Sequence, residues 1–383
     1  MNAKRYRLLF ILNVLNPGTG PFQRAVRLDP ERLDITILSC MDSQEEMMRK
    51  AKRLYNRECG HRLVGLDAKS RLAFILRLCR VMLEVRPDII QVNHTFSAVV
   101  AILFSLLIST PVRVAFEGTL LTRYGYTRRF FMSLIYSLTD GVISVSKAVK
   151  SINHTASGKL GEYINRRVIY NGVDIGDIDR IRELPLTKQE NLDDAFVIGY
   201  VGDLKPLKDV GTLIRAFAQF VEKWPENSRL VIIGGGAQES ALKSIANEVG
   251  VIDRTIFTGQ IERRSVYEFL PRLDVFVMPS RVEGLSEAIV QAMAAEVPVI
   301  ASDIAPNREL ISHGTTGLIF EPGNEQALTD ALVLIAGDIE IRKEFSRRSR
   351  EFVERKLDIF HIVDEYHDFY KELISRKELD GYK

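Results

Sequence analysis

Cysteine is scarce in this 383-residue sequence, and the few cysteines are not spaced for metal or disulfide chemistry. The three of them, Cys40, Cys59 and Cys79, are an odd number with no C-x-x-C pair. Such usage excludes a disulfide framework and a cysteine zinc site, and it is typical of a reducing compartment. The six histidines show no H-E-x-x-H pairing either, so the sequence predicts no metal site.

Long hydrophobic runs are also missing. The run Leu8–Val14 is too short for a secretory signal and ends at the polar Asn16 and Pro17. The longest run, Ala98–Ile108, falls short of the about 18–20 residues that cross a bilayer, and we interpret it as a buried helix. We therefore expect a cytoplasmic protein without a transmembrane span.

The chain lacks a strong charge of one sign. The net charge of +2 argues against a nucleic-acid partner, but it conceals a difference between the two halves. Residues 1–185 carry 28 Lys and Arg against 17 Asp and Glu, a balance of +11, which leaves −9 for the remainder. One half can therefore face an anionic surface while the other does not.

Both the length and the hydrophobic pattern predict two α/β domains. A chain of 383 residues exceeds the usual size of one core. Short β-branched runs alternate with longer helical patterns, which predicts two doubly wound, Rossmann-like parallel sheets over 1–184 and 185–355. The expected strands are Tyr6–Val14, Leu33–Leu38, Asp88–Val92, Val112–Phe116, Gly141–Val145, Arg167–Ile169, Phe196–Val201, Arg229–Ile233, Thr255–Phe257, Val275–Met278, Val299–Ala301 and Gly317–Phe320. Ligands of such sheets bind at the carboxyl ends of the strands, and we expect the active site in the cleft where the domains face each other.

Two loops after expected strands are candidates for phosphate binding. Gly18 and Gly20 form a strand-to-helix turn at which backbone N–H groups can approach a phosphate, although a tight connecting turn is the alternative. The spacing does not match the dinucleotide G-x-G-x-x-G fingerprint. In the second domain, Lys205 and Lys208 stand before a helix start, a pattern that favours a diphosphate.

The most informative segment runs from Pro279 to Asp303. A strand leads into Glu283 and Gly284, then into a helix start with free N–H groups, with Glu287 and Gln291 on one helix face. An acid and an amide can bracket a polyhydroxylated ligand there. The alternative, a loop charge followed by a first-turn charge, explains Glu287 but not the Glu283-Gly284 pair.

These segments together resemble the family 4 glycosyltransferases, retaining enzymes of the GT-B fold. The resemblance covers nearly the whole chain and includes the glycine turn, the loop at 202–208 and the E-G-L…A-M-A block; further matches are Val145–Val149, Asn171–Asp174, Ile233–Gly236 and Phe257–Gly259. It implies that a C-terminal helix within 356–383 crosses back to the N-terminal, acceptor-side domain. Phe360, Val363, Tyr366, Phe369 and Tyr370 supply an apolar stripe for it.

The resemblance also implies roles for individual residues. Glu283 and Gly284 would bind the donor sugar, with Glu283 as a catalytic candidate. Leu285 and Ser286 would give backbone N–H groups to the diphosphate, together with Lys208, Lys205, Gly18 and Gly20. The ribose and base would lie near Gln291, Gly259 and Gln260.

Three positions depart from the family pattern. Gln291 replaces the usual second glutamate, so it loses charge toward a ribose diol. Asp203 replaces a diphosphate-binding arginine and would repel phosphate unless Lys205 or Lys208 compensates. Glu117 stands where the family commonly has histidine beside the reacting sugar, either as a catalytic base or as a hydrogen-bond acceptor.

The expected activity is transfer of a sugar from a nucleotide-diphosphate sugar to a lipid-linked or cell-surface saccharide, without metal or other cofactor. The implied route is front-face displacement, in which cations and dipoles stabilise the departing diphosphate. The basic and aromatic segment Tyr124–Met132 favours docking to anionic headgroups at the inner face of the plasma membrane, against the alternative of a solvated helix start. Two other functions stay open: a non-catalytic GT-B scaffold or regulatory subunit, and a nucleotide-sugar epimerase.

Overall fold

The computed structural model describes residues 5–14, 20–54, 61–68, 70–93, 95–182, 192, 195–224 and 227–379. Contacts between residues divide the chain into two compact units. The first unit contains Met1–Asn171 together with Phe360–Lys383, and the second contains Gly172–Ile359. The first unit is therefore built from both ends of the chain.

The first unit holds a seven-stranded parallel sheet in the order β3-β2-β1-β4-β5-β6-β7. The order reverses between β1 and β4, which makes this pair the topological switch point. The strands are β1 (Tyr6–Leu12), β2 (Leu33–Ser39), β3 (Arg62–Gly65), β4 (Ile89–Val92), β5 (Val112–Glu117), β6 (Gly141–Ser144) and β7 (Arg166–Val168).

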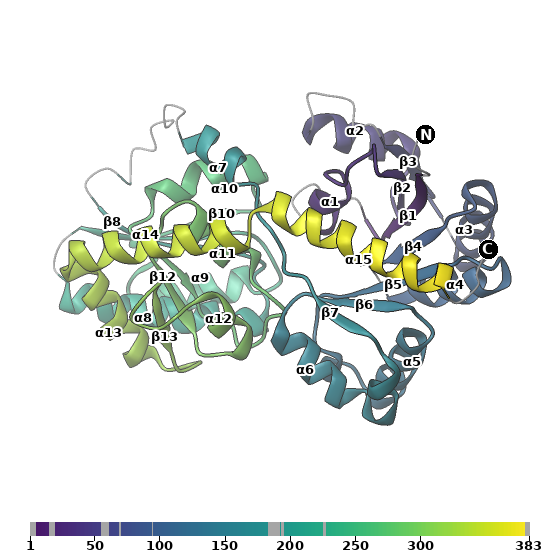
Figure 1. Cartoon of the computed structure of the whole chain (residues 1–383). Coiled ribbons are helices and arrows are strands. Elements are labelled where there is room, and N and C mark those ends of the chain that lie inside the picture. Colours follow the sequence, from purple (N-terminus) through teal and green to yellow (C-terminus); the bar gives the residue numbers. More distant parts are fainter. Residues whose placement is uncertain are drawn as a thin grey trace. The chain divides into compact units, whose positions relative to one another are not determined.

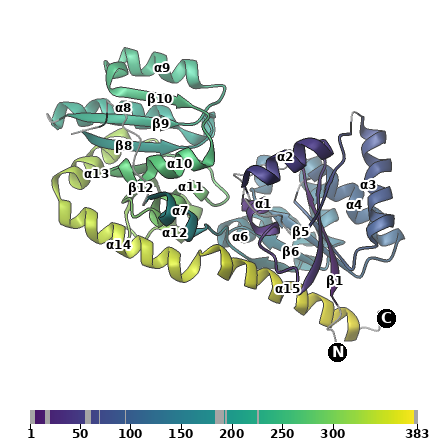
Figure 2. The same cartoon turned by 90° about the horizontal axis from the view of Figure 1, so that it is seen from above.

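Helices cover both faces of this sheet because alternate strand residues point to opposite sides. Leu8 and Phe10 belong to a core shared with α1 (Gly20–Ala25), α2 (Gln44–Leu54) and α15 (Ile359–Leu379). Leu9 and Ile11 belong to the other core, shared with α3 (Arg71–Val85), α4 (Thr95–Leu107) and α5 (Tyr126–Ser137). Figure 2 shows α3 and α4 on one side of β1, and α1 and α15 on the other. The unit is completed by α6 (Lys147–Ala156) and the 3-10 turns η1 (Leu121–Arg123) and η2 (Gly158–Tyr163).

The second unit holds a six-stranded parallel sheet in the order β10-β9-β8-β11-β12-β13 (Figure 1). Its switch point lies between β8 (Phe196–Val201) and β11 (Val275–Met278). The other strands are β9 (Ser228–Ile233), β10 (Thr255–Gly259), β12 (Val299–Ser302) and β13 (Leu318–Phe320). The helices are α7 (Ile175–Arg182), α8 (Val210–Lys223), α9 (Glu239–Glu248), α10 (Arg263–Phe269), α11 (Glu287–Ala294), α12 (Ala305–Leu310), α13 (Glu325–Gly337) and α14 (Ile339–Lys356), with the turns η3 (Pro206–Lys208), η4 (Ile252–Arg254) and η5 (Leu270–Arg272).

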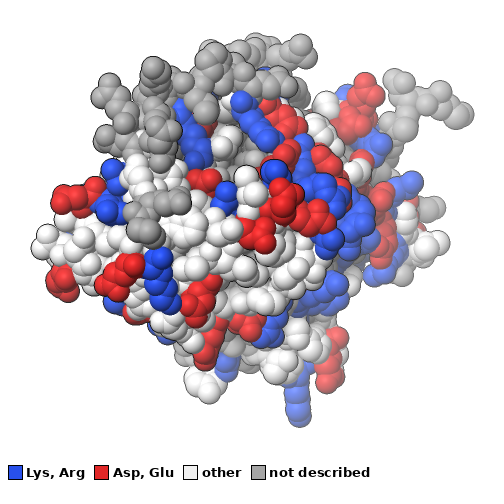
Figure 3. All heavy atoms as spheres, turned by 90° about the vertical axis from the view of Figure 1, so that its left-hand side faces the viewer, with Lys and Arg blue, Asp and Glu red and all other residues white. Residues whose placement is uncertain are grey.

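The outer surface of the second unit carries charges of both signs. Figure 3 shows basic and acidic side chains intermingled on the face that it presents. Helix α14 contributes several such contacts between residues three or four positions apart, for example Arg347 with Glu344 and Glu351. Such exposed pairs each contribute little to stability, and they keep the surface solvated.

The division between the units falls at Asn171 and Gly172, earlier than the boundary expected at 184 and 185. The reason is α7, which packs against α10 and α11 of the second unit. In addition, the N–H of Val173 donates to the carbonyl of Leu357 at 2.9 Å, and the N–H of Ile359 donates to the carbonyl of Val173 at 2.9 Å. The two passages of the chain between the units therefore lie side by side.

Helix α15 completes one core of the first unit. Val363, Tyr366, Phe369 and Tyr370 are buried in that core, as the expected stripe requires. Phe360 is an exception, with 59% of its surface exposed, because it lies on the outward side of the first turn, whose Ile359 and Ile362 are buried. The tip of the Phe369 ring lies so close to Gly141 of β6 that a Cβ there would stand 2.5 Å from it.

Among the described residues, no helix is both long and apolar enough to span a membrane. Cys40 and Cys79 are free, and Cys59 lies outside the described residues. Burial raises the pKa of the Cys40 thiol to about 12, so this cysteine stays protonated at neutral pH.

We expect Phe369→Ala to destabilise the first unit by about 3–5 kcal/mol, because it removes a fully buried ring from the α15 contact. Urea denaturation followed by tyrosine fluorescence measures this as an earlier unfolding transition. The matched control is Phe360→Ala in the same helix, which removes a mostly exposed ring and should change the transition little. Equal shifts for the two variants would contradict the packing described.

Candidate functional site

Two loops meet at the switch point of the second unit. The first follows β8 and carries Lys208, and the second follows β11 and carries Glu283. The Lys208 Nζ lies 2.6 Å from the Glu283 Oε1, although 75 positions separate the two residues. Both side chains are largely buried, with 23% and 10% of their surfaces exposed. The structure thus brings together two residues that the sequence placed in one site.

Neighbouring side chains hold Glu283 in place. The Ser280 hydroxyl donates to the same Oε1 at 2.7 Å. Ser280 is itself anchored, because its carbonyl accepts a hydrogen bond from the Ser302 hydroxyl at the end of β12. The amide of Asn307 donates to the Ser302 carbonyl at 2.9 Å. Lys208 and Ser280 both contact Oε1 of Glu283, so Oε2 has no partner among the described residues and can accept from a ligand hydroxyl.

A second ion pair ties the same two loops together. The Arg281 Nε lies 2.8 Å from an Asp209 carboxylate oxygen, and the N–H of Arg281 donates to the carbonyl of Leu207 at 2.8 Å. Asp209 has a left-handed backbone, with φ of 50°, immediately before α8 begins. These contacts fix the turn that presents Lys208 toward Glu283.

The start of α11 supplies the expected N–H groups. Ser286 is the N-cap, and its hydroxyl accepts from the N–H of Ile289 at 3.4 Å. Leu285 and Ser286 are buried, and Gly284 and Gln291 are half-buried. The first N–H groups of a helix have no partner within the helix and carry its positive dipole end. An anion beside Lys208 would therefore meet two sources of positive charge.

Lys205 pairs with a different carboxylate, that of Asp203. Its Nζ lies 2.5 Å from the Asp203 carboxylate, and both side chains are more than 60% exposed. Lys205 thus balances the acid that stands where the family pattern has arginine, which leaves Lys208 as the cation at Glu283. The buried Tyr200 hydroxyl donates to the Asp203 carbonyl at 3.1 Å, and burial raises the pKa of this phenol.

Glycines keep the edge of this sheet open. At Gly234, with φ of 134°, a Cβ would stand 2.0 Å from the Gly202 carbonyl oxygen, so only glycine fits. Gly259 also has a left-handed backbone, and its carbonyl accepts from the Gly234 N–H at 3.0 Å. Gln260 follows and is exposed. A ligand base or ribose can approach this backbone closely.

The glycine turn of the first unit is only partly described. Gly18 lies outside the described residues. Gly20 begins α1 and is buried.

The first unit has a pocket of about 260 Å³ at the carboxyl ends of β4 and β5. Its lining mixes polar and aromatic groups: Val92, Asn93, Ala98, Phe116, Glu117, Gly118, Thr119, Leu121, Tyr124 and Tyr136. Burial, and next the charge of Glu117, raise the pKa of Tyr136 well above its usual range, so its hydroxyl stays protonated. A small polar ligand would find both donors and acceptors here.

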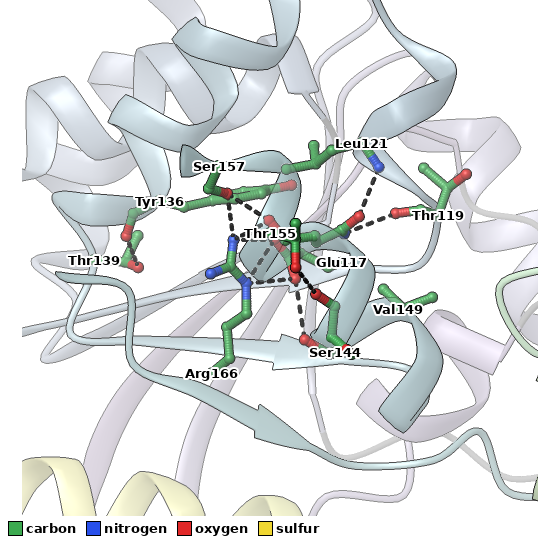
Figure 4. Close-up of polar contacts among 12 residues, drawn as sticks. Glu117, Thr119, Leu121, Tyr136, Thr139, Ser144, Val149, Thr155, Ser157 and Arg166 are labelled. Atoms are coloured by element: carbon green, nitrogen blue, oxygen red, sulfur yellow. Dashed lines mark hydrogen bonds and ion pairs between the residues drawn. The ribbon is translucent and has the colours of Figure 1, made fainter. Parts of the chain in front are cut away.

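Glu117 is held by a buried ion pair (Figure 4). Arg166 donates through Nε to Oε2 at 3.1 Å and through Nη2 to Oε1 at 3.1 Å. Ser144 donates to Oε2 at 3.0 Å. Both charged side chains are 1% exposed. Because both carboxylate oxygens are engaged, this geometry favours the hydrogen-bonding alternative for Glu117 over a free base.

The same network reaches the loop that forms the pocket. Arg166 also donates to the hydroxyl of Ser157 at 2.9 Å, at the end of α6. From α6, the Asn153 side chain accepts from the N–H of Leu121 at 2.7 Å and donates to the carbonyl of Thr119 at 3.1 Å. Figure 4 shows these contacts gathered around Glu117. The network therefore holds one wall of the pocket.

Sequence reasoning missed Arg166, Asn153, Ser280 and the Asp209–Arg281 pair. Ser280 lies three residues before Glu283 in the informative segment, so this short spacing was a usable signal. No local sequence signal pointed to Arg166 or Asn153, because their partners come from other strands and helices.

We expect Arg166→Met to lower the free energy of unfolding of the first unit by about 3–5 kcal/mol, because it leaves the Glu117 charge buried without a partner. Arg167→Met is the control, since the adjacent Arg167 pairs with Glu372 at about 40% exposure, and it should cost about 1 kcal/mol or less. Urea denaturation measures both. A double variant, Glu117→Leu with Arg166→Met, should recover part of the loss. Equal effects of the two single variants would contradict the role of burial.

Comparisons with known proteins identify the family and the fold of the chain. The second unit matches the family described as glycosyl transferases group 1 over residues 185–352, and the first matches glycosyltransferase family 4 over residues 25–177. The N-acetyl-alpha-D-glucosaminyl L-malate synthase of Bacillus anthracis is 22% identical over 79% of each chain. The capsular polysaccharide biosynthesis glycosyltransferase CapM of Staphylococcus aureus is 24% identical over 81% of this chain and 83% of its own. The solved structure of Anabaena HepE in complex with UDP-glucose superposes with a TM-score of 0.80 at 21% identity, covering 96% of this chain and 100% of HepE. The chain belongs to the family 4 glycosyltransferases and has their GT-B fold.

Proposed function

We propose that this glycosyltransferase moves a sugar, with retention of its anomeric configuration, from a nucleotide-diphosphate sugar to a lipid-linked or cell-surface saccharide. The observation that carries the proposal is the contact of Lys208 with Glu283 at the switch point of the second unit. A cation and a carboxylate side by side match a donor that has a diphosphate next to a polyhydroxylated ring.

In this proposal the donor binds between Lys208 and Glu283, and its own contacts replace the one between these two side chains. Lys208 and the N–H groups at Leu285 and Ser286 bind the diphosphate, and Glu283 accepts from sugar hydroxyls. Gln291, Gly259 and Gln260 bind the ribose and base. The structure of HepE with UDP-glucose supports a donor of this class, because its fold is the same.

The proposed chemistry is front-face displacement. The bond between the anomeric carbon and the diphosphate oxygen breaks, and a bond to the acceptor oxygen forms on the same face of the sugar. The departing phosphate oxygen takes the proton of the acceptor hydroxyl. Lys208 and the α11 N-terminus stabilise the negative charge that develops on the diphosphate. Oriented by Ser280, Glu283 holds the sugar for this step.

The acceptor is proposed to bind in the pocket of the first unit. The protonated Tyr136 hydroxyl, which lines this pocket together with Asn93 and Thr119, offers a donor to saccharide hydroxyls. The name of CapM associates that relative with capsular polysaccharide, which supports a saccharide acceptor here. We place the reaction at the inner face of the plasma membrane, where a lipid-linked saccharide would be presented.

The donor assignment predicts different effects for two variants. Lys208→Ala should weaken binding of a nucleoside diphosphate by about 1.5–3 kcal/mol, the range for a charge-assisted hydrogen bond. Glu283→Gln should reduce turnover without weakening the bare nucleoside diphosphate, because that ligand lacks the sugar.

Calorimetric titration with UDP and GDP measures both affinities, after a panel of nucleotide sugars has been screened by thermal stabilisation. Saturation at about 100 times the Kd adds about 2.7 kcal/mol of stability. The control is Lys205→Ala, which removes the partner of Asp203 and should have the smaller effect. Full activity in Lys208→Ala or Glu283→Gln would refute the assignment, and product formed without any acceptor would indicate an epimerase.

Transfer should survive EDTA, because Lys208 and the α11 N-terminus supply the positive charge at the diphosphate. Radiolabelled sugar transfer with and without EDTA is the measurement. Loss of turnover that Mn²⁺ or Mg²⁺ restores would overturn the metal-independent mechanism.

A further inference from the structure

Three helices of the first unit expose large apolar side chains. Helices α3, α4 and α5 pack side by side over one face of the sheet, with α4 in contact with both others. Their inward residues form the core, yet their outward sides are also apolar. The exposed side chains are Leu72, Leu76 and Leu83 on α3, Leu103, Leu106 and Leu107 on α4, and Tyr126, Phe130, Phe131 and Leu134 on α5. We refer to this set as the outer face.

The spacing of these residues shows that they lie along the outward side of their helices. Leu72, Leu76 and Leu83 recur at intervals of four and seven residues, so they form one stripe along α3. The core residues Phe74 and Leu78 lie on the opposite side of the same helix. Helix α4 contains no charged residue over its whole length. Helices that cover a sheet normally turn polar residues outward, and contiguous apolar patches on a protein surface mark interaction sites.

Arginines border the outer face at α5. Arg128 lies over the Tyr124 ring at 4.0 Å from its centroid, and Arg129 lies over the Tyr126 ring at 4.4 Å. The Tyr126 side chain is 82% exposed. Arginine and aromatic side chains that share one surface match the boundary between headgroups and acyl chains, where apolar rings and phosphates meet.

The charged residues of the three helices are mostly basic. Neither α4 nor α5 contains Asp or Glu. The acid on α3, Glu84, pairs with Arg80 at 3.0 Å and with Arg62 at 3.5 Å. An anionic partner is therefore favoured over a second protein surface of mixed charge.

We propose that the outer face of α3, α4 and α5 docks on an anionic lipid bilayer. The leucines and phenylalanines enter the headgroup region, and Arg128 and Arg129 contact lipid phosphates. Tyr124 also lines the pocket of the first unit, so docking would bring lipid headgroups to the pocket entrance. That last step rests on the proposed function, whereas docking itself does not.

The test is co-sedimentation of the full chain with vesicles, which needs no donor or acceptor. We expect binding to vesicles of phosphatidylcholine with phosphatidylglycerol and little binding to phosphatidylcholine alone. Phe131→Glu should reduce binding at least about tenfold, because it removes a ring that enters the bilayer. The matched control is Phe360→Glu, a ring of similar exposure at 59% against 55%, in α15 on the other face of the sheet. It should bind like the natural chain.

Arg128→Gln with Arg129→Gln should reduce binding to anionic vesicles by about fivefold for each arginine and weaken its dependence on salt. Circular dichroism checks that each variant is folded. Equal binding of Phe131→Glu and the natural chain would overturn the proposal, as would absence of vesicle binding at low salt. A dimer that Phe131→Glu dissociates, without vesicle binding, would assign the outer face to a second copy instead. If the chain binds vesicles but shows no transferase activity, the proposed function is refuted and the docking proposal stands.

Discussion

Parallel strand pairing places the carboxyl ends of all strands at the same edge of a sheet, and both sites depend on this constraint. In the second unit, the strand order reverses between β8 and β11, so the loops that follow these strands have no helix crossing between them. Lys208 and Glu283 meet there for that reason. In the first unit, the same edge gathers Asn93 after β4 and Glu117 at the end of β5.

The sheets were predictable because buried parallel strands are nearly continuous apolar runs. The edge strand β3 (Arg62–Gly65) was missed, since it has four residues, begins with an exposed arginine and offers only one fully buried side chain. Helix α14 was missed for a related reason. Its eighteen residues are mostly charged, and only three of them, Phe345, Ser349 and Val353, are buried. A pattern of few apolar positions carries little information about either element.

The meeting of Lys208 and Glu283 was predictable, because each residue follows an expected strand of the second unit. The partners that orient those residues were not. Glu117 was expected as either a catalytic base or a hydrogen-bond acceptor, and the pairing of both its oxygens with Arg166 from β7 was not foreseen. Such pairing depends on how the chain folds back on itself, which local sequence does not report.

The neighbouring passages at Val173 and Asp358 have a consequence for synthesis on the ribosome. The second unit is one continuous insertion whose two ends meet, so it can complete its core as soon as its last residues emerge. The first unit begins earlier and finishes later. Its sheet face around Phe10 and Ile143 lacks the Tyr366 and Phe369 side chains until the final helix is made. The newborn chain therefore exposes an apolar sheet surface throughout translation of the insertion, which is the interval when chaperones have a surface to bind.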